Sequence, residues 1–315
     1  MPLDDFQKEI LELIRNNRAT SSPFAGGSAI QYHGMRLSDD QDIFITGDPE
    51  PVMRIDKQVL VDAGLIVQET KTYTGFRECR VMRPGVSTTL LQWTQALNLE
   101  YFAPVPDPDF GQRLHFVDLA VNKTLAAATR MEEHDFVDLW MLDRHVMPLW
   151  RMACAAGSKS LDFGPLALIE RISFNRTLSI TNSNNQSSIV HTTQPPNGEP
   201  THGLLDAIDK ARLILPRFPE LWLGKLQLNN KGQPILDKDL VATEGESWIL
   251  PELGGALPTF EGIDDQMVAA LIAEYGEEDN QPTESIEPQA NQDGREDYSP
   301  FDIPDPFAPP SPYNT

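Results

Sequence analysis

The sequence of 315 residues is poor in cysteine. Its two cysteines, Cys79 and Cys154, form no CxxC pair and have no histidines at zinc-ligand spacing. We therefore expect neither a disulfide framework nor a structural zinc site. Hydrophobic residues make up 40% of the chain and charged residues 23%, which is ordinary globular usage and indicates a folded protein.

Long apolar runs and a secretory leader are also missing. No stretch of about 18 apolar residues occurs, which is the length that a membrane-spanning helix requires. The first residues, MPLDDFQKEI, are acidic and lack the basic start and apolar core of a signal peptide. We expect a cytoplasmic protein without membrane contact.

Basic residues are scarce, since 25 Lys and Arg face 47 Asp and Glu for a net charge of −22. Most of the excess lies after residue 241, where Arg295 is the one basic residue. The preceding part is only mildly acidic, so its charge does not oppose a nucleotide or RNA ligand. It also offers no basic field of the kind that nucleic-acid binders usually carry.

Several common catalytic signatures are absent from the chain. The sequence contains no Walker A, GxGxxG, HExxH or GxSxG pattern. Its histidines are isolated from one another, which favours packing or surface roles over catalysis.

Hydrophobic periodicity predicts a small mixed sheet with flanking helices in the first half of the chain. Helical spacing covers residues 4–17 and the segment after Pro49, where Val52, Ile55, Val59 and Leu60 are expected to face inward. A strand, a tight turn and a helix capped by Ser28 are expected across 24–30. Further strands are predicted over 41–46, 65–72, 76–82 and 87–97, a loop over 104–111, and helices over 118–130 and 134–143.

The second half of the chain is expected to be mainly helical, with helices over 161–172 and 202–215 and a flexible polar insertion near 182–200. Residues 276–315 are rich in proline and acids, which predicts a disordered tail. We therefore expect three parts in an α+β protein. These are a sheet-containing domain over 1–145, a helical region over 146–275 and the tail.

The segment from Gly26 to Asp42 has the most informative chemistry. Side chains alternate along a strand, so Asp40 and Asp42 share one face with Cα atoms about 6.6 Å apart. Such a pair can hold Mg²⁺ or Mn²⁺, which prefer hard oxygen ligands. Gly26 and Gly27 before a helix allow a triphosphate to approach the backbone, and the Ser28 hydroxyl can add a donor.

Two blocks of this sequence resemble the AbiEii/AbiGii-type nucleotidyltransferase toxins of bacteria. Gly26-Gly27-Ser28-Ala29 followed by Arg36-Leu37-Ser38-Asp39-Asp40-Gln41-Asp42-Ile43-Phe44 is similar to the first family motif. Asp118-Leu119-Ala120-Val121-Asn122-Lys123, with Arg130 and His134-Asp135-Phe136-Val137-Asp138-Leu139, is similar to the second. Both blocks occur in the family's order, over roughly residues 20–145.

The resemblance implies a nucleotidyltransferase fold and roles for residues of the second block. Lys123 would neutralise phosphate charge, and Asp138, or alternatively Asp135, would be a late acidic element of the site. The same residues can also be interpreted as an exposed helix with local ion pairs. His134 stands where the family has arginine. Gln92, or a neighbour within residues 88–93, lies on the strand where related polymerases often have a third carboxylate, which indicates a two-acid metal site.

We expect transfer of a nucleoside monophosphate from an NTP to an acceptor, with Asp40 and Asp42 as metal ligands. The resemblance implies a toxin of a toxin–antitoxin or phage-defence pair, a cognate antitoxin as partner, and the 3′ end of tRNA as one acceptor. Two alternatives stay open. One is a regulatory module that binds nucleotide without turnover, and the other is an enzyme that nucleotidylates a protein.

Overall fold

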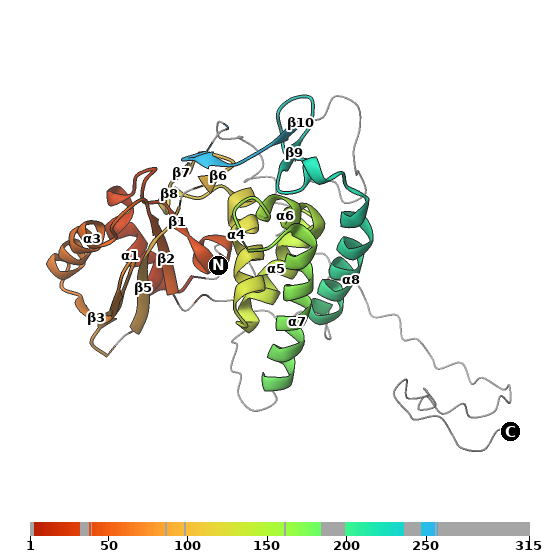
Figure 1. The fold of residues 1–315 in the computed structure, drawn as a ribbon. Coiled ribbons are helices and arrows are strands. Elements are labelled where there is room, and N and C mark those ends of the chain that lie inside the picture. Colours follow the sequence, from red (N-terminus) through yellow and green to blue (C-terminus); the bar gives the residue numbers. More distant parts are fainter. Residues whose placement is uncertain are drawn as a thin grey trace, which may run out of the picture.

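The computed structural model describes residues 3–31, 38, 40–85, 87–97, 99–160, 162–183, 199–235, 247–255 and 257. Over these residues the chain is a mixed α+β protein, as the sequence predicts (Figure 1). Nearly all of the flexible insertion expected at 182–200, and the whole tail expected at 276–315, lie outside the described residues.

The largest sheet combines antiparallel and parallel pairing. Within the described residues its seven strands are ordered β3-β4-β5-β2-β1-β8-β7. Strand β2 pairs in parallel with β5 and antiparallel with β1, and β3, β4 and β5 form an antiparallel meander. The strands are β1 (Phe24–Ala25), β2 (Asp40–Ile45), β3 (Ile66–Tyr73), β4 (Phe76–Arg83), β5 (Ser87–Gln95), β7 (Val105–Asp107) and β8 (Gly111–Arg113).

Helices α1 (Asp5–Ile14) and α3 (Glu50–Asp62) cover one face of this sheet. Apolar side chains of α1, such as Ile10 and Ile14, share a buried cluster with Ile43 and Ile45 of β2. The expected opening helix is confirmed, and it ends in the 3-10 turn η1 (Arg15–Asn17). One orientation within α3 was predicted wrongly, because Ile55 is 56% exposed.

Asp56 takes the inward position next to Ile55, and its side chain is fully buried. It accepts hydrogen bonds from the Arg18 guanidinium and from Trp93 Nε1, the latter at 2.8 Å. A buried carboxylate with these partners is satisfied, whereas an unpaired one would be costly. Hydrophobicity alone could not show that the inward residue of α3 is an acid.

The opposite face of the sheet turns toward a group of packed helices (Figure 1). Helix α4 packs against α5, α6 and α7, while α8 packs against α5 and α6. The short helix α2 lies between β2 and this group, in contact with β2, α4 and α5. These helices are α2 (Gly26–Gln31), α4 (Phe116–Thr129), α5 (Glu133–His145), α6 (Leu149–Ala156), α7 (Pro165–Ser183) and α8 (Glu199–Ile214).

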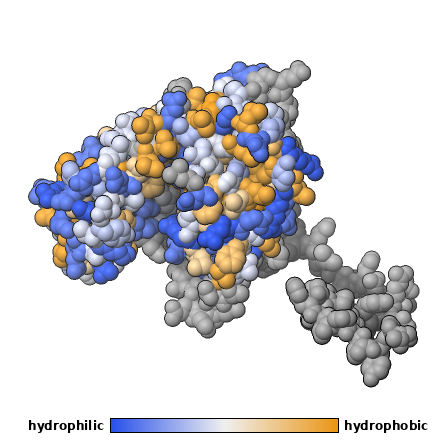
Figure 2. Space-filling model, viewed as in Figure 1, coloured by the Kyte–Doolittle hydropathy of each residue, from blue (hydrophilic) through white to orange (hydrophobic). Residues whose placement is uncertain are grey.

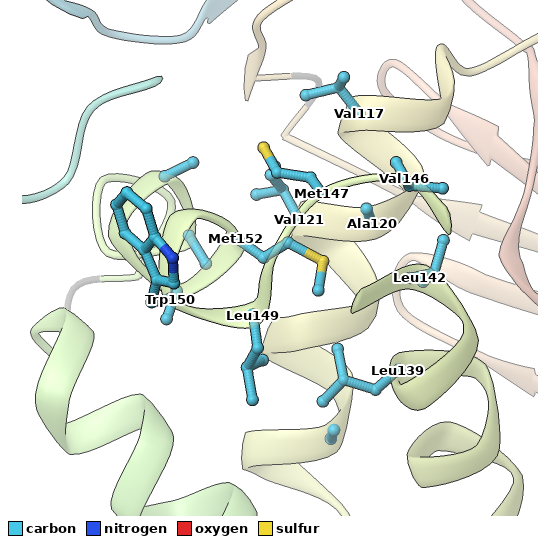
Figure 3. Close-up of a cluster of buried hydrophobic side chains, with 14 of the residues drawn as sticks. Val117, Ala120, Val121, Leu139, Leu142, Val146, Met147, Leu149, Trp150 and Met152 are labelled. Carbon is cyan, nitrogen blue, oxygen red and sulfur yellow. The ribbon is translucent and has the colours of Figure 1, made fainter. Parts of the chain in front are cut away.

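A continuous apolar core joins these helices (Figure 3). Figure 3 shows Val121 of α4, Leu139 of α5 and Trp150 of α6 pointing into the same interior. Trp140 and Trp150 are buried in this core. The core also includes Ala29 of α2, so it extends from the start of the chain to its helical half. The predicted boundary at residue 145 stays a prediction.

Smaller elements complete the described structure. The loop expected over 104–111 is instead a hairpin, because β7 and β8 pair antiparallel around a turn at residues 108–110, and β8 begins at Gly111 with a φ of 75°. Two further strand pairs, β6 with β11 and β9 with β10, lie beside the helices. Their bounds, with those of the 3-10 turns, are β6 (Leu99–Glu100), β9 (Leu226–Leu228), β10 (Ser247–Ile249), β11 (Glu252–Leu253), η3 (Leu215–Arg217) and η4 (Glu220–Trp222).

The molecular surface is mixed in polarity. Figure 2 shows hydrophilic and hydrophobic residues interspersed on the face seen in Figure 1. None of the helices that the structure describes is both long and apolar enough to cross a membrane.

Candidate metal and nucleotide site

Strand β2 presents two carboxylates on one face. Asp40 and Asp42 are half-buried, whereas the alternate residues Gln41, Ile43 and Ile45 are buried. The second group faces α1 and α3, so the aspartates lie on the face that turns toward the helices. Strand alternation, which predicted a shared face for the acids, is confirmed by this burial pattern.

Helix α1 fixes the start of this strand. Gln7 belongs to a capping box with Asp4, and its Nε2 also donates to the Ser38 carbonyl at 2.6 Å. Gln41 Nε2 in turn donates to the Gln7 carbonyl at 3.1 Å. The Ser38 hydroxyl, itself buried, donates to Asp40 Oδ1 at 3.2 Å. A chain of buried hydrogen bonds therefore positions Asp40, and such bonds are costly to break.

Gly26 makes room for the Asp42 carboxylate. Strand β1 pairs Ala25 with Asp42, and the chain then turns through Gly26 with a φ of 65°. A Cβ built on Gly26 would lie 1.7 Å from Asp42 Oδ2, which no side chain can tolerate. Only glycine satisfies both the left-handed backbone and this close approach.

The glycine pair and Ser28 differ from their expected local roles. Helix α2 begins at Gly26, so both glycines lie within its first turn and Ser28 is a helical residue instead of the cap. Burial and Asp40 raise the pKa of Asp42, and a hydrogen bond donated by the Gly27 N–H acts against this rise. The pair thus holds a carboxylate in place, a contact that the sequence does not reveal. Whether Gly27 also contacts a phosphate stays a prediction.

The Ser28 hydroxyl is a buried polar group at the edge of this site. Ser28 is 0% exposed, and among the described residues its Oγ has no hydrogen-bond partner. Buried polar atoms are nearly always paired, by protein, water or ligand. An orphaned hydroxyl next to Gly26 and Gly27 therefore favours the expectation that Ser28 contacts a ligand. Residues 32–37 and 39, which include Arg36, Leu37 and Asp39 of the first motif, lie outside the described residues.

Lys123 of α4 is buried against two carboxylates of α5. Its Nζ lies 2.8 Å from Asp135 Oδ1 and 3.0 Å from Asp138 Oδ2. All three side chains are buried. The interpretation of an exposed helix with local ion pairs is therefore wrong, because these pairs connect two helices within the interior. Both of the acids proposed for the second motif contact the lysine.

Arg130 supplies the positive charge that the motif's arginine would provide at the position of His134. Its Nε lies 2.5 Å from Asp135 Oδ2 and its Nη2 lies 2.9 Å from Asp135 Oδ1. His134 Nε2 lies farther away, at 3.5 Å from the same carboxylate. Burial raises the pKa of Asp135, but Lys123 and Arg130 outweigh it and hold that pKa below its usual value. Arg130 precedes Asp135 by five residues, whereas the motif has its arginine directly before the aspartate. The motif alone therefore could not predict this ion pair.

The carboxylates and cations of the two motifs form one electrostatic group. Burial and the neighbouring Asp40 carboxylate raise the pKa of Asp42 to about 7, while Lys123 and Arg130 act in the opposite direction. Lys123 and Arg130 are paired with the acids of α5, Asp135 and Asp138. Asp40 and Asp42 add further negative charge on β2, which a bound divalent cation would neutralise.

The donor set of β2 fits Mg²⁺ or Mn²⁺. Both ions prefer hard oxygen ligands, and one or two carboxylates are typical of a magnesium site that also binds a nucleotide. Asp40 and Asp42 provide such a pair, but among the described residues no group of three or more His, Cys, Asp or Glu side chains could hold a metal. The neighbour of Asp42 on β5 is Gln92, in agreement with a two-acid site.

Asp118, the first residue of the second motif, belongs to another buried ionic cluster. Lys159 Nζ lies 2.9 Å from Glu100 Oε2 and 3.0 Å from Asp118 Oδ1. The Asp118 carboxylate also accepts from the backbone N–H groups of Tyr101 and Phe102. Desolvation raises the pKa of Glu100 to about 8, with Lys159 opposing it. These contacts give Asp118 a structural role, since they connect α4 to β6 and to the end of α6.

Comparisons with known proteins give distant structural similarity only. No family model matches the sequence, and no curated protein matches it. Among solved structures, MenT4, a nucleotidyltransferase toxin from Mycobacterium tuberculosis H37Rv, superposes with a TM-score of 0.39 and 12% sequence identity. The superposition covers 68% of this chain and 83% of MenT4. A similarity of this size establishes neither a shared fold nor a shared activity.

Proposed function

We propose that this chain is a metal-dependent nucleotidyltransferase that moves a nucleoside monophosphate from an NTP to an acceptor. The observation that carries the proposal is that Asp40 and Asp42 share one half-buried face of β2, with Asp42 close enough to Lys123 and Arg130 to interact electrostatically. A carboxylate pair near the buried Lys123 and the more exposed Arg130 suits a ligand that combines divalent metal with phosphate.

Each residue of the site has a role in this proposal. Asp40 and Asp42 hold Mg²⁺ or Mn²⁺, which when bound neutralises charge on the transferred phosphoryl group. Ser28 donates its unpaired hydroxyl to a phosphate oxygen, and the Gly26 and Gly27 backbone borders the same ligand. Lys123 contributes positive charge near the phosphates, while Asp138 and Asp135 hold its ammonium in place.

The acceptor and the biological role rest on the sequence motifs. Their resemblance to bacterial nucleotidyltransferase toxins suggests a toxin with a cognate antitoxin, acting on the 3′ end of tRNA. The residues of the site do not distinguish an RNA acceptor from a protein acceptor. A protein acceptor therefore remains a separate outcome of the test.

Transfer of label from the four α-³²P-labelled NTPs tests the proposal. Purified protein, total cellular RNA and Mg²⁺ or Mn²⁺ are incubated, and label is followed in RNA and in protein. We expect metal-dependent label in RNA from the wild-type chain and none from Asp42→Asn. Label in protein alone would identify a protein-nucleotidylating enzyme. Nucleotide binding without any transfer would support the regulatory module and contradict the proposal.

A further inference from the structure

We propose that Gln92 is the third protein ligand of the metal site, through its amide oxygen, and that Glu78 is the positioning residue that orients this amide. The inference rests on the proposed function, because it assigns a further oxygen to the same metal as Asp40 and Asp42.

Strand register places Gln92 beside Asp42. The two residues are direct partners across the parallel pair β2 and β5, and Gln92 is in turn the partner of Glu78 across β5 and β4. Paired residues point to the same face of a sheet, and adjacent strands lie about 4.8 Å apart. The side chains of Asp42, Gln92 and Glu78 therefore form one row across the face that contains the metal-binding acids.

Glu78 determines which end of the Gln92 amide faces it. Gln92 Nε2 donates to Glu78 Oε2 at 3.0 Å. Glu78 is 2% exposed, and Lys71 Nζ also lies 3.1 Å from Glu78 Oε2. Because the amide nitrogen of Gln92 faces the Glu78 carboxylate, the amide oxygen of Gln92 faces away from it.

The geometry leaves the Gln92 oxygen available. Within the described part of the chain nothing donates to Gln92 Oε1, and the strand on the far side of Gln92 from Glu78 is β2 with Asp42. Glu78 itself lies two strands from Asp42, about 10 Å at ordinary strand spacing. It is also engaged by Thr70 Oγ1 at 2.8 Å. Amide and carboxylate oxygens are both hard ligands, so Gln92 suits the ion that Asp40 and Asp42 select.

Manganese binding without nucleotide tests this assignment independently of turnover. Free Mn²⁺ is measured by electron paramagnetic resonance during titration of folded wild-type protein and variants. We expect Gln92→Ala to weaken binding on the order of 10-fold, and Glu78→Gln several-fold because the amide is no longer oriented. The exchanged pair, Gln92→Glu combined with Glu78→Gln, should bind Mn²⁺ at least as tightly as wild type, since a carboxylate replaces a neutral oxygen and the new amide at position 78 can donate to it. Thr94→Ala, on the same face of β5 beside Phe44, is the matched control and should bind like wild type.

The outcomes separate this inference from the proposed function. If Asp42→Asn loses Mn²⁺ binding while Gln92→Ala binds like wild type, the ligand assignment is overturned and the carboxylate site stands. If Asp42→Asn also binds like wild type, both fail. Thermal unfolding of each variant verifies folding. Should Gln92→Ala not fold, weaker Mn²⁺ binding by the folded exchanged pair, Gln92→Glu with Glu78→Gln, than by wild type would overturn the assignment.

Discussion

At the scale of single residues, the site depends on contacts between a small residue and a charged one. Gly26 leaves the space that Asp42 Oδ2 fills, and the Gly27 N–H donates to the same carboxylate. Ser38 holds Asp40 from the other end of the segment. The sequence predicted the acids and the glycines, but it assigned the glycines to a phosphate and did not connect them with Asp42. That connection requires β1 to lie beside β2, which no local pattern encodes.

Gly26→Ala should abolish metal binding and nucleotide transfer, because the new methyl group displaces Asp42. The left-handed φ also costs about 1 to 2 kcal/mol for a residue with a side chain. Gly64→Ala is the matched control, since Gly64 has a φ of 83° and nothing within 4 Å of a built Cβ. Both variants should lose similar backbone stability in urea unfolding, and only Gly26→Ala should lose Mn²⁺ affinity. Equal Mn²⁺ affinity in the two variants would contradict this role of Gly26.

At the scale of secondary-structure elements, the sequence predicted most strands and helices and left their partners open. Alternation located β2 to within one residue, because Asp40 and Asp42 alternate with buried residues. It oriented α3 wrongly at Ile55, since the paired acid Asp56 faces inward instead. Helical spacing predicted that Asp135 and Asp138 share a face of one helix. It could not show that both contact Lys123 of another helix. A sequence pattern assigns charged residues to the surface, because it contains no information about the tertiary partners that can pair with them in the interior.

Lys123→Met should destabilise the fold by about 3 to 5 kcal/mol at neutral pH, because Asp135 and Asp138 lose a buried cation. Lys57→Met, which removes a partly exposed ion pair with Glu69, is the control and should cost at most about 1 kcal/mol. Urea unfolding of the variants and wild type measures both losses. Equal losses of unfolding free energy in the two variants would contradict the stabilising role of the buried Lys123 ion pairs.

The stability deficit of Lys123→Met relative to wild type should depend on pH. In wild type the folded pKa of Asp135 is depressed, so its contribution is present above the unfolded pKa and is lost as pH falls through the folded pKa. That places the wild-type loss below about pH 4. Without Lys123 the buried acids favour the protonated form, so the variant's deficit should shrink as pH falls from 7.5 to 5. A deficit that is constant over this range, measured by urea unfolding, would contradict the ion-pair account.

At the scale of the whole molecule, the site lies where the sheet meets the helices. Strand β2 supplies the two acids of the proposed metal site, and α4 and α5 supply the neighbouring cation with its partners. Helices α6, α7 and α8 bury the other sides of α4 and α5 in the core that also includes α2. The sequence predicted helices in this half but missed α6 entirely, because eight residues between loops give too short a pattern.

This shared core predicts that residues 1–145 do not fold alone. Without α6 to α8, apolar residues of α4 and α5 such as Val121 and Leu139 would be exposed to water. We expect the fragment to show no cooperative thermal transition by circular dichroism. A chain ending at residue 276 should unfold like the full chain, because the removed segment is too polar and proline-rich to bury much surface. Cooperative unfolding of the fragment would support an independent domain boundary near residue 145.

The central claim is that Asp40 and Asp42 hold the metal for nucleotidyl transfer, and pyrophosphate release from NTP tests it most directly. The assay uses wild type, Asp40→Asn and Asp42→Asn, with Mg²⁺ or Mn²⁺ and with chelator, in the presence of total RNA. We predict metal-dependent release by wild type and a loss on the order of 100-fold or more in each variant, with unfolding still cooperative. Wild-type rates in either folded variant, or release that persists in chelator, would contradict the account.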